Sequence, residues 1–216
     1  RDTDRSRGLG DVYKRQDLQK RLKSKDKFTE PLQCPFITHW LHNMTHDQVL
    51  DMLKYLGMGN RPEDKVKVIF VPCYQDGHDG ILNKHYYDLI LGEDLSVYPS
   101  YYEPWGYTPL ESVAFRVPTI TTDLAGFGLW VNSLKNQHGI NDGVEVLHRS
   151  DYNYSEVADG IKDTVALFST KTEAEIKEIR KRAGQVAEQA LWKHFIQYYY
   201  EAYDIALRNA MKRQLK

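Results

Sequence analysis

The sequence contains little cysteine and no long apolar run. Its 216 residues include two cysteines, Cys34 and Cys73, which are too few for a disulfide-bonded scaffold or a four-cysteine zinc site. No stretch of about 18 apolar residues suggests a transmembrane helix, and the N-terminal residues are too polar for a secretory signal. These absences favour a cytoplasmic protein whose thiols are reduced.

An excess of one charge is also lacking. Lys and Arg number 29 and Asp and Glu number 30, which gives a formal net charge of -1. No overall basic field attracts nucleic acid or an anionic membrane, so neither is an expected partner. With 41% hydrophobic residues, a chain of this length has enough apolar surface to bury a core, which excludes a wholly disordered protein.

Tyrosine, by contrast, is abundant. The chain has 15 Tyr and 4 Trp, and many of them gather in residues 98–107 and 198–203. Tyrosine-rich rims often bind sugars or nucleobases, although ordinary half-buried packing is the better interpretation of any single position.

The N-terminal 34 residues differ from the rest. Residues 1–16 (RDTDRSRGLGDVYKRQ) are rich in charge and glycine, have no apolar period, and end in a run that resembles sequencing-adapter read-through. We expect them to be a non-native or disordered leader. Residues 17–34 read as a charged helix or linker, and the domain itself is expected over residues 35–216.

Past residue 35 short apolar strands alternate with helices. The pattern predicts strands over residues 65–72, 95–99, 118–122 and 144–147, and helices over 47–56, 83–91 and 109–115. The first helix would begin at Thr45 or Asp47 and end at Gly57 or Gly59. Three closing helices follow over 157–168, 176–190 and 192–210. Short connections and strands without polar alternation predict an α/β fold, a Rossmann-like doubly wound parallel sheet with helices on both faces.

In such a sheet, ligands bind beyond the carboxyl ends of the strands. The segments at those positions are CYQDGHDG (73–80), SYYEPWGYTPLE (100–111) and DLAGFG (123–128). In the second segment a Pro/Gly turn leads into a helix whose first turn includes Thr108, and the free N–H groups of such a turn form a phosphate seat. The plainer alternative is that Thr108 only caps the helix, with Pro109 at its first position.

Two carboxylates, Glu103 and Glu111, flank this turn. Eight positions of helix separate two residues by roughly 12 Å, whereas a retaining glycosidase needs carboxyl groups about 5 to 5.5 Å apart. The spacing suits two carboxylates that hold different parts of one long ligand, such as a nucleotide sugar. The alternative is a solvated helical Glu111 and an incidental loop Glu103.

The run YPSYYEPWGYTPLES, followed by VPTITTDLAGFG, resembles the C-terminal domain of the eukaryotic-type glycogen synthases, which are retaining GT-B glucosyltransferases. The resemblance begins near PFITHWLHNM and reaches LWKHF, about 180 residues. It implies a catalytic Glu103 at the transferred glucose, Glu111 at the ribose hydroxyls, and a diphosphate-binding turn. It also implies a uracil-stacking role for Tyr86, for which core packing is an equal alternative. The substrate-binding residues expected on this basis are Tyr86, Tyr102, Trp105, Gly106, Tyr107, Thr108 and Glu111.

The resemblance implies transfer of glucose from UDP-glucose to the non-reducing end of an α-1,4-glucan, with retention and without a metal or other cofactor. The family's N-terminal domain and its basic Arg/Lys pair are not in this sequence, so we expect no transfer by this polypeptide alone. The expected partners are UDP-glucose, glycogen, that N-terminal domain and a possible homo-oligomer. Two alternatives stay open: another retaining GT-B glucosyltransferase, or a non-catalytic nucleotide-sugar or glycogen-binding module.

A basic helix near the C-terminus raises the question of regulation. Family members bind glucose 6-phosphate through an arginine-dense helix, and the corresponding EIKEIRKRAGQ keeps Arg180, Lys181 and Arg182. Allosteric binding at Arg180 and Arg182 is therefore weakly indicated, and a solvated basic face is favoured.

Signals for a metal are weak. His42 and His46 form an i, i+4 pair beside His39, but no Glu follows His42 as in zinc proteases and no third ligand is indicated. The loop QDGHDG (75–80) lacks the ligand pattern of an EF-hand, so we predict a turn there. GMG (57–59) and GFG (126–128) do not complete a dinucleotide fingerprint. His78 and His148 lie near strand ends, where a loop histidine satisfied by its neighbours is the favoured interpretation.

Overall fold

The computed structural model describes residues 41–43, 45–134 and 139–214. The predictions for the leader, the charged linker, Cys34 and His39 fall outside these residues. The chain divides into two compact units, with the boundary between Leu89 and Ile90. None of the helices in these three ranges is both long enough and apolar enough to cross a lipid bilayer.

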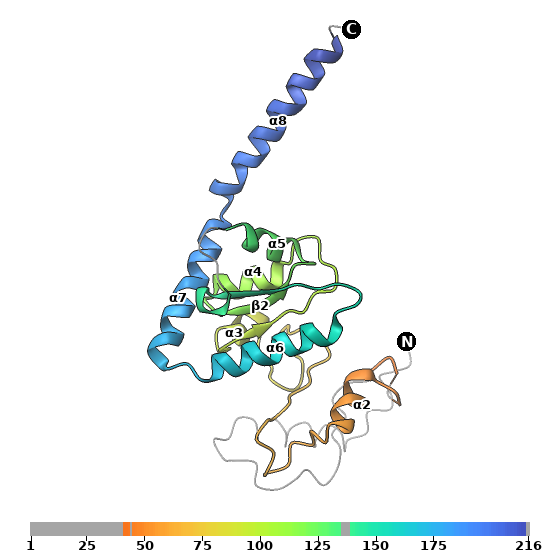
Figure 1. Cartoon of the computed structure of the whole chain (residues 1–216). Coiled ribbons are helices and arrows are strands. Elements are labelled where there is room, and N and C mark those ends of the chain that lie inside the picture. Colours follow the sequence, from red (N-terminus) through yellow and green to blue (C-terminus); the bar gives the residue numbers. More distant parts are fainter. Residues whose placement is uncertain (1–40, 44, 135–138, 215–216) are drawn as a thin grey trace. The chain divides into compact units, whose positions relative to one another are not determined.

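The second unit is built on a small parallel sheet (Figure 1). Its strands are β1 (Ser96–Val97), β2 (Thr119–Thr122) and β3 (Val144–Leu147), in the spatial order β1-β2-β3. Both pairings are parallel, with Ser96 opposite Thr119 and Thr119 opposite Val144. Every residue of β2 is buried, as expected for a parallel strand covered on both faces. Three of the four predicted strands are thus confirmed.

Helices connect and close this sheet. The crossover helices α4 (Tyr107–Ala114) and α5 (Gly126–Ser133) follow β1 and β2, and a short 3-10 helix, η1 (Ile140–Asp142), precedes β3. The closing helices are α6 (Tyr154–Ser169), α7 (Glu173–Gln189) and α8 (Trp192–Gln214). These confirm the predicted helix at 109–115 and the three terminal helices. The prediction missed α5, whose first turn contains Gly126 and Gly128, and glycine has a low helix propensity.

The side chains of β3 alternate between two helical layers. Val144 and Val146 pack into the main core with Phe127 and Val131 of α5 and Ala183 of α7. Leu147 faces the opposite way, and its Cδ2 lies 3.0 Å from where a Cβ on Gly160 of α6 would be. Figure 1 shows α4 and α5 on one side of the sheet and α6 on the other. The predicted α/β architecture with helices on both faces is confirmed.

The predicted strand at residues 65–72 is wrong. The only β pairing among the described residues of the first unit is an isolated bridge between Asp76 and His85. Within the predicted strand, Val66 and Ile69 are more than half exposed. A β-branched run becomes a strand only where a neighbouring edge supplies backbone partners. Here the amide side chain of Asn60 supplies the hydrogen-bond partners instead. It donates to the Val68 carbonyl at 2.7 Å and accepts the Val68 N–H at 2.8 Å.

The two described helices that precede β1 are short. In α2 (Gln48–Tyr55), the Asp47 carboxylate accepts the N–H groups of Val49 and Leu50, both at 3.0 Å, so Asp47 is the cap. The other helix, α3 (Tyr86–Ile90), starts later than the predicted residue 83. Asn83 has a left-handed φ of 51°, and a non-glycine residue in that region does not continue a right-handed helix.

The turn before α3 is held by a buried carboxylate. Asp79 is 4% exposed and accepts the backbone N–H groups of Ile81, Leu82 and Asn83 at 2.7 to 2.8 Å. Burial by itself raises the pKa of Asp79, but these backbone donors outweigh it and hold the pKa below its ordinary value. The loop is a turn, as predicted.

Threonine hydroxyls within β2 differ in their partners. Thr119 Oγ1 lies 2.8 Å from Ser112 Oγ and 3.0 Å from the Val117 carbonyl, and Thr122 Oγ1 donates to the Ser100 carbonyl at 2.6 Å. Thr121 is also fully buried, yet among the described residues its hydroxyl has no hydrogen-bond partner. An unpaired buried hydroxyl costs stability.

We predict opposite effects of the same substitution at two positions of β2. Thr121→Val removes the unpaired hydroxyl without changing the shape of the side chain, so the free energy of unfolding should rise by about 1 kcal/mol. Thr119→Val removes the hydroxyl that bonds to Ser112 and Val117, so the free energy of unfolding should fall by about the same amount. Urea unfolding of each variant measures both changes, and an equal loss in the two variants would refute the prediction.

We also predict a pH-dependent effect at Asp79. Since the folded-state pKa is lowered, the carboxylate stabilises the turn above the unfolded value of about 3.9, and that stabilisation is lost as pH falls through the folded-state pKa. At pH 7, Asp79→Asn should speed amide hydrogen exchange at Ile81, Leu82 and Asn83 by about tenfold.

The control for this prediction is Asp76→Asn, because the exposed Asp76 carboxylate accepts the His78 N–H at 2.9 Å instead. Its exchange rates at residues 81–83 should match those of the unsubstituted chain. Equal rates in all three proteins at pH 7 would show that the Asp79 charge does not hold the turn.

Candidate functional site

Two of the three predicted strand-end segments meet in the structure. The Glu103 N–H donates to the Leu124 carbonyl at 3.1 Å, and the Glu103 carbonyl accepts the Gly126 N–H at 3.1 Å. The Trp105 carbonyl then accepts the Phe127 N–H at 2.6 Å. Residues 103–105 thus lie along residues 124–127 like an added strand. The third segment, 73–80, belongs to the other unit.

Glycine makes this contact possible. A Cβ on Gly126 would lie 2.3 Å from the Pro104 carbonyl oxygen, and one on Gly128 would lie 2.1 Å from that of Thr122. Any larger residue would push the two backbone segments apart. The GFG pair therefore serves close backbone packing.

The turn itself ends in a glycine-capped helix. Gly106 is buried, has a φ of 100° and a ψ of 76°, and is the N-cap of α4. A side chain is strained in this left-handed conformation. As a glycine, Gly106 has no side chain that could cap the helix, and the first N–H groups of an α-helix have no partner within the helix. The alternative in which Thr108 is the cap is therefore wrong, because Thr108 is the second helical residue.

Three predicted ligand-binding residues share the outer face of α4. Pro109, Ser112 and Val113 form its buried face. Tyr107 is 70% exposed, Thr108 is exposed, and Glu111 is half-buried. Residues three and four apart are neighbours on a helix surface, so Glu111 lies beside Tyr107 and Thr108.

Glu103 lies next to the same turn. Its side chain is exposed, and its Cγ is 3.6 Å from where a Cβ on Gly106 would be. Tyr102, one residue earlier, is 79% exposed. The structure thus brings Tyr102, Glu103 and the start of α4 to one edge of the second unit, which is the edge at which the parallel strands end.

Trp105 has a clear packing role. Its ring centroid lies 6.2 Å from that of Phe127, 5.9 Å from Trp130 and 5.6 Å from Phe195. These contacts fasten the turn to α5 and to the first turns of α8, at distances typical of edge-to-face and tilted aromatic pairs. A direct ligand contact by Trp105 stays a prediction.

Tyr86 belongs to the other unit. It is the first residue of α3, its N–H donates to the Gln75 carbonyl at 3.0 Å, and its ring lies 5.4 Å from that of Tyr87. Its role as a base-stacking residue stays a prediction.

The two candidate allosteric arginines bond to their own chain. Arg180 donates to the Glu93 carbonyl at 2.8 Å, and Arg182 donates to the Asp142 carboxylate at 2.7 Å and to Glu178 at 3.4 Å. The Asp142 and Glu178 partners raise the pKa of Arg182. These contacts tie α7 to η1 and to the loop before β1, and allosteric binding at Arg180 and Arg182 stays a prediction.

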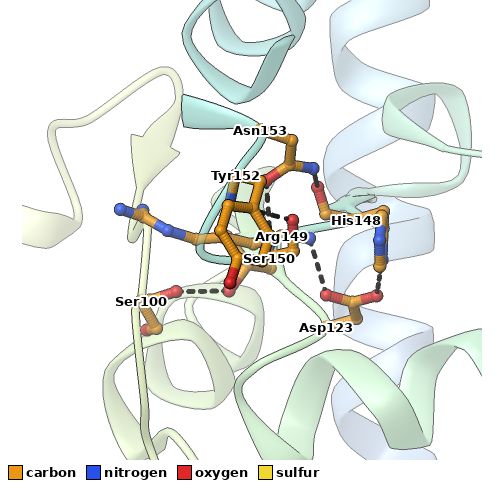
Figure 2. A network of polar contacts seen from close by, with 8 residues as sticks. Ser100, Asp123, His148, Arg149, Ser150, Tyr152 and Asn153 are labelled. Atoms are coloured by element: carbon orange, nitrogen blue, oxygen red, sulfur yellow. Dashed lines mark hydrogen bonds and ion pairs between the residues drawn. The ribbon is translucent and has the colours of Figure 1, made fainter. Parts of the chain in front are cut away.

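A polar network joins all three strand ends (Figure 2). Asp123 follows β2, and its carboxylate bonds to His148 Nδ1 at 2.6 Å and to the Arg149 N–H at 2.8 Å, both just after β3. The Arg149 guanidinium donates to the Pro99 carbonyl, after β1, at 2.7 Å and stacks on Tyr101. Sequence analysis noted His148 alone. Asp123 and His148 lie 25 residues apart in the sequence, and Pro99 and Arg149 lie 50 residues apart. The only sequence signal for these residues is their position just after a predicted strand.

Within the described residues, no group of three or more His, Cys, Asp or Glu side chains is arranged to hold a metal ion. His42, His46 and His78 are exposed, and the loop at 75–80 uses its buried carboxylate on backbone N–H groups.

The family model and the similar known proteins point to the same family. The sequence model of the family described as glycogen synthase matches residues 11–216. Glycogen [starch] synthase isoform 1 of Saccharomyces cerevisiae is 32% identical over 84% of this chain, and the Neurospora crassa glycogen [starch] synthase is 31% identical over 89%. The human liver glycogen [starch] synthase is 27% identical over 94%. The chain spans 26%, 27% and 29% of the length of these three relatives.

We predict that Gly126→Ala separates the two strand-end segments. The added Cβ would overlap the Pro104 carbonyl, and the free energy of unfolding should fall by about 1–3 kcal/mol. Gly59→Ala is the control, since its Cβ would meet nothing closer than 3.8 Å. Urea unfolding measures both, and an unchanged midpoint for Gly126→Ala would contradict the close packing.

Proposed function

We propose that this chain, which belongs to the glycogen synthase family, supplies the donor-binding part of a retaining GT-B glucosyltransferase that uses UDP-glucose. The observation that carries the proposal is the start of α4, whose N-cap Gly106 has no capping side chain and which Glu103 flanks. The relatives are roughly three to four times longer than this chain, as the coverage of 26% to 29% implies.

The diphosphate of the donor is proposed to bind at the start of α4. The N–H groups of Tyr107 and Thr108 have no intrahelical acceptor, and the helix dipole adds a partial positive charge. Thr108 is exposed on the same turn, and its hydroxyl supplies a further donor. Gly106 has to be glycine here, because its left-handed conformation aims the chain into the helix without a side chain over the anion.

The two glutamates are proposed to hold the two ends of the donor. Glu111 lies on the face of α4 that carries Tyr107 and Thr108, where it accepts hydrogen bonds from ribose hydroxyls. Glu103, in the turn before the helix, lies at the glucosyl end, where its negative charge stabilises the positive charge that develops on the sugar ring.

Catalysis on this proposal depends mainly on stabilising the leaving diphosphate. As the bond between the anomeric carbon and the phosphate oxygen breaks, negative charge grows on UDP, and the helix terminus stabilises it. The departing phosphate accepts the proton of the attacking glucan hydroxyl on the same face, and a new glycosidic bond forms with retention. The proposal assigns no step to a metal or redox cofactor.

The 216-residue polypeptide is proposed to bind the donor but not to transfer glucose. In a GT-B enzyme two domains close on the substrate, and this chain spans 26% and 27% of two of its relatives. The acceptor is an α-1,4-glucan. A stand-alone binding module is not favoured, because the named relatives are all glycogen synthases.

Donor binding by two variants tests this assignment of roles. Glu111→Gln should weaken UDP and UDP-glucose equally, by about tenfold or more, because it loses a charged hydrogen bond to the ribose that both ligands share. Glu103→Gln should weaken UDP-glucose only, because UDP lacks the glucosyl group. Isothermal titration calorimetry of the 216-residue chain with each ligand measures the four dissociation constants.

Glu156→Gln, an exposed glutamate in the first turn of α6, is the matched control and should bind both ligands like the unsubstituted chain. If Glu103→Gln weakens UDP as much as UDP-glucose, the assignment of Glu103 is wrong. If the unsubstituted chain binds neither ligand, the donor-binding proposal itself fails.

A further inference from the structure

We propose that the polar network at the strand ends is a saccharide-binding site, and that its ligand is a segment of α-1,4-glucan. The site consists of the outward edge of His148 together with the rings of Tyr101 and Tyr152. The identity of the glucan rests on the proposed function, whereas the saccharide chemistry follows from the side chains themselves.

His148 is exposed but held in one orientation. Its side chain is 77% exposed, whereas that of its partner Asp123 is 21% exposed. In the tautomer with its proton on Nδ1, the ring donates to the Asp123 carboxylate at 2.6 Å. Nε2 is then the acceptor on the outward edge of the ring. A saccharide hydroxyl is a natural donor to such an acceptor.

Folding stability alone gives little reason for this arrangement. A solvent-exposed contact between two polar side chains contributes about 0–1 kcal/mol at most, and ordering exposed side chains costs conformational entropy. Asp123 nevertheless uses both carboxylate oxygens, one for His148 and one for the Arg149 N–H. The geometry points to a pre-organised binding surface, in which the ordering has been done before the ligand arrives.

Two tyrosines add flat apolar surfaces to the network, Tyr101 against the Arg149 guanidinium and Tyr152 four positions after His148 in the sequence. Tyr101 is 55% exposed, and its ring is fixed by the Arg149 guanidinium, 5.1 Å from the ring centroid, and by a hydrogen bond from its hydroxyl to Asp151. Tyr152 is 96% exposed on the loop that the Asn153 side chain closes through Ser150 N–H and the His148 carbonyl. Figure 2 shows Tyr152 in this network, near Arg149.

A pyranose ring has an apolar face of C–H groups and a rim of hydroxyls. An exposed aromatic ring packs against the face, and a fixed imidazole accepts a hydrogen bond from the rim. The combination of exposed aromatic rings and an oriented acceptor therefore fits a neutral sugar.

Charge argues against an anionic ligand. The Arg149 guanidinium is already engaged with the Pro99 carbonyl and the Tyr101 ring, and the carboxylates of Asp123 and Asp151 lie in the same network. Two carboxylates near one engaged guanidinium repel a phosphate. A neutral glucan encounters no such repulsion.

The position of the network also suits an acceptor glucan. Asp123 is the residue before Leu124, whose carbonyl accepts the Glu103 N–H, and Thr122 Oγ1 donates to the Ser100 carbonyl. The network and the proposed glucosyl site thus share the same two backbone segments. A glucan held here lies at the edge of the sheet that carries Glu103.

Glucan binding by the 216-residue chain tests the proposal. Native electrophoresis in gels that contain glycogen should retard the chain, and maltoheptaose should shift the NMR signals of the His148 ring. Tyr152→Ala and His148→Ala should each weaken maltoheptaose binding by about tenfold, through the loss of stacking or of the hydrogen bond. UDP-glucose binding should be unchanged in both variants.

The matched control is Tyr200→Ala, because Tyr200 is an exposed tyrosine on α8, far along the chain from the network; its maltoheptaose affinity should equal that of the unsubstituted chain. Unfolding midpoints within error of the parent exclude misfolding as the cause of a loss. Raising the NaCl concentration to about 0.5 M should leave binding unchanged, because the ligand is neutral.

Asp123→Asn separates positioning from mere contact. The carboxamide of this variant can donate to Nδ1 of the His148 ring, which makes Nε2 a donor in place of an acceptor. The ¹⁵N shifts of His148 report this tautomer change, and maltoheptaose affinity should fall with it. An unchanged affinity in a chain that shows the new tautomer would overturn the role of His148.

The outcomes distinguish this proposal from the proposed function. No retardation by glycogen, equal affinity in Tyr152→Ala and the parent, or binding that salt abolishes would overturn the saccharide site. Loss of UDP-glucose binding with intact maltoheptaose binding would instead refute the donor-binding proposal and leave a saccharide site in place.

Discussion

Backbone pairing between the turn at 103–105 and the segment at 124–127 is the contact on which the edge of the second unit depends. It fixes Glu103, brings Trp105 into an aromatic cluster with Phe127 and Trp130, and sets the direction in which the chain enters α4. Gly126 permits the approach, because no side chain fits between it and the Pro104 carbonyl. The start of α4 is therefore located by tertiary contacts, while its open N–H groups are a consequence of the glycine cap.

Strand β2 connects this turn to the polar network. It lies between β1 and β3, and at its carboxyl end Thr122 bonds to Ser100 while Asp123 bonds to His148 and Arg149. These groups come from residues that end a strand or lie within a few positions of its end. A parallel sheet places all such residues on one edge, so a few short strands suffice to assemble side chains that are 25 to 50 residues apart.

The buried elements could be predicted from the sequence because local pattern and tertiary structure agree in them. The runs around β1, β2 and β3 are rich in β-branched residues, and the last helices have clear periodicity with a capping box at Thr172. The prediction failed at residues 65–72, because these strand-forming residues have no strand partner among the residues described. It also failed at α5, because Gly126 and Gly128 are required there for close backbone packing although glycine has a low helix propensity.

For the candidate site, spacing alone located the turn but not its support. The Gly106–Thr108 run signals a helix start, and Glu103 and Glu111 stand out as charges beside it. The packing of Trp105 against Phe195 and the pairing of Arg182 with Asp142 join residues 90 and 40 positions apart in sequence, and no local pattern encodes such contacts. The Trp105 contact matters for the proposed diphosphate site, because backbone amides are only as well ordered as the turn that holds them. The aromatic cluster orders that turn, so the geometry proposed for binding at Gly106 depends as well on side chains that lie behind it in the core.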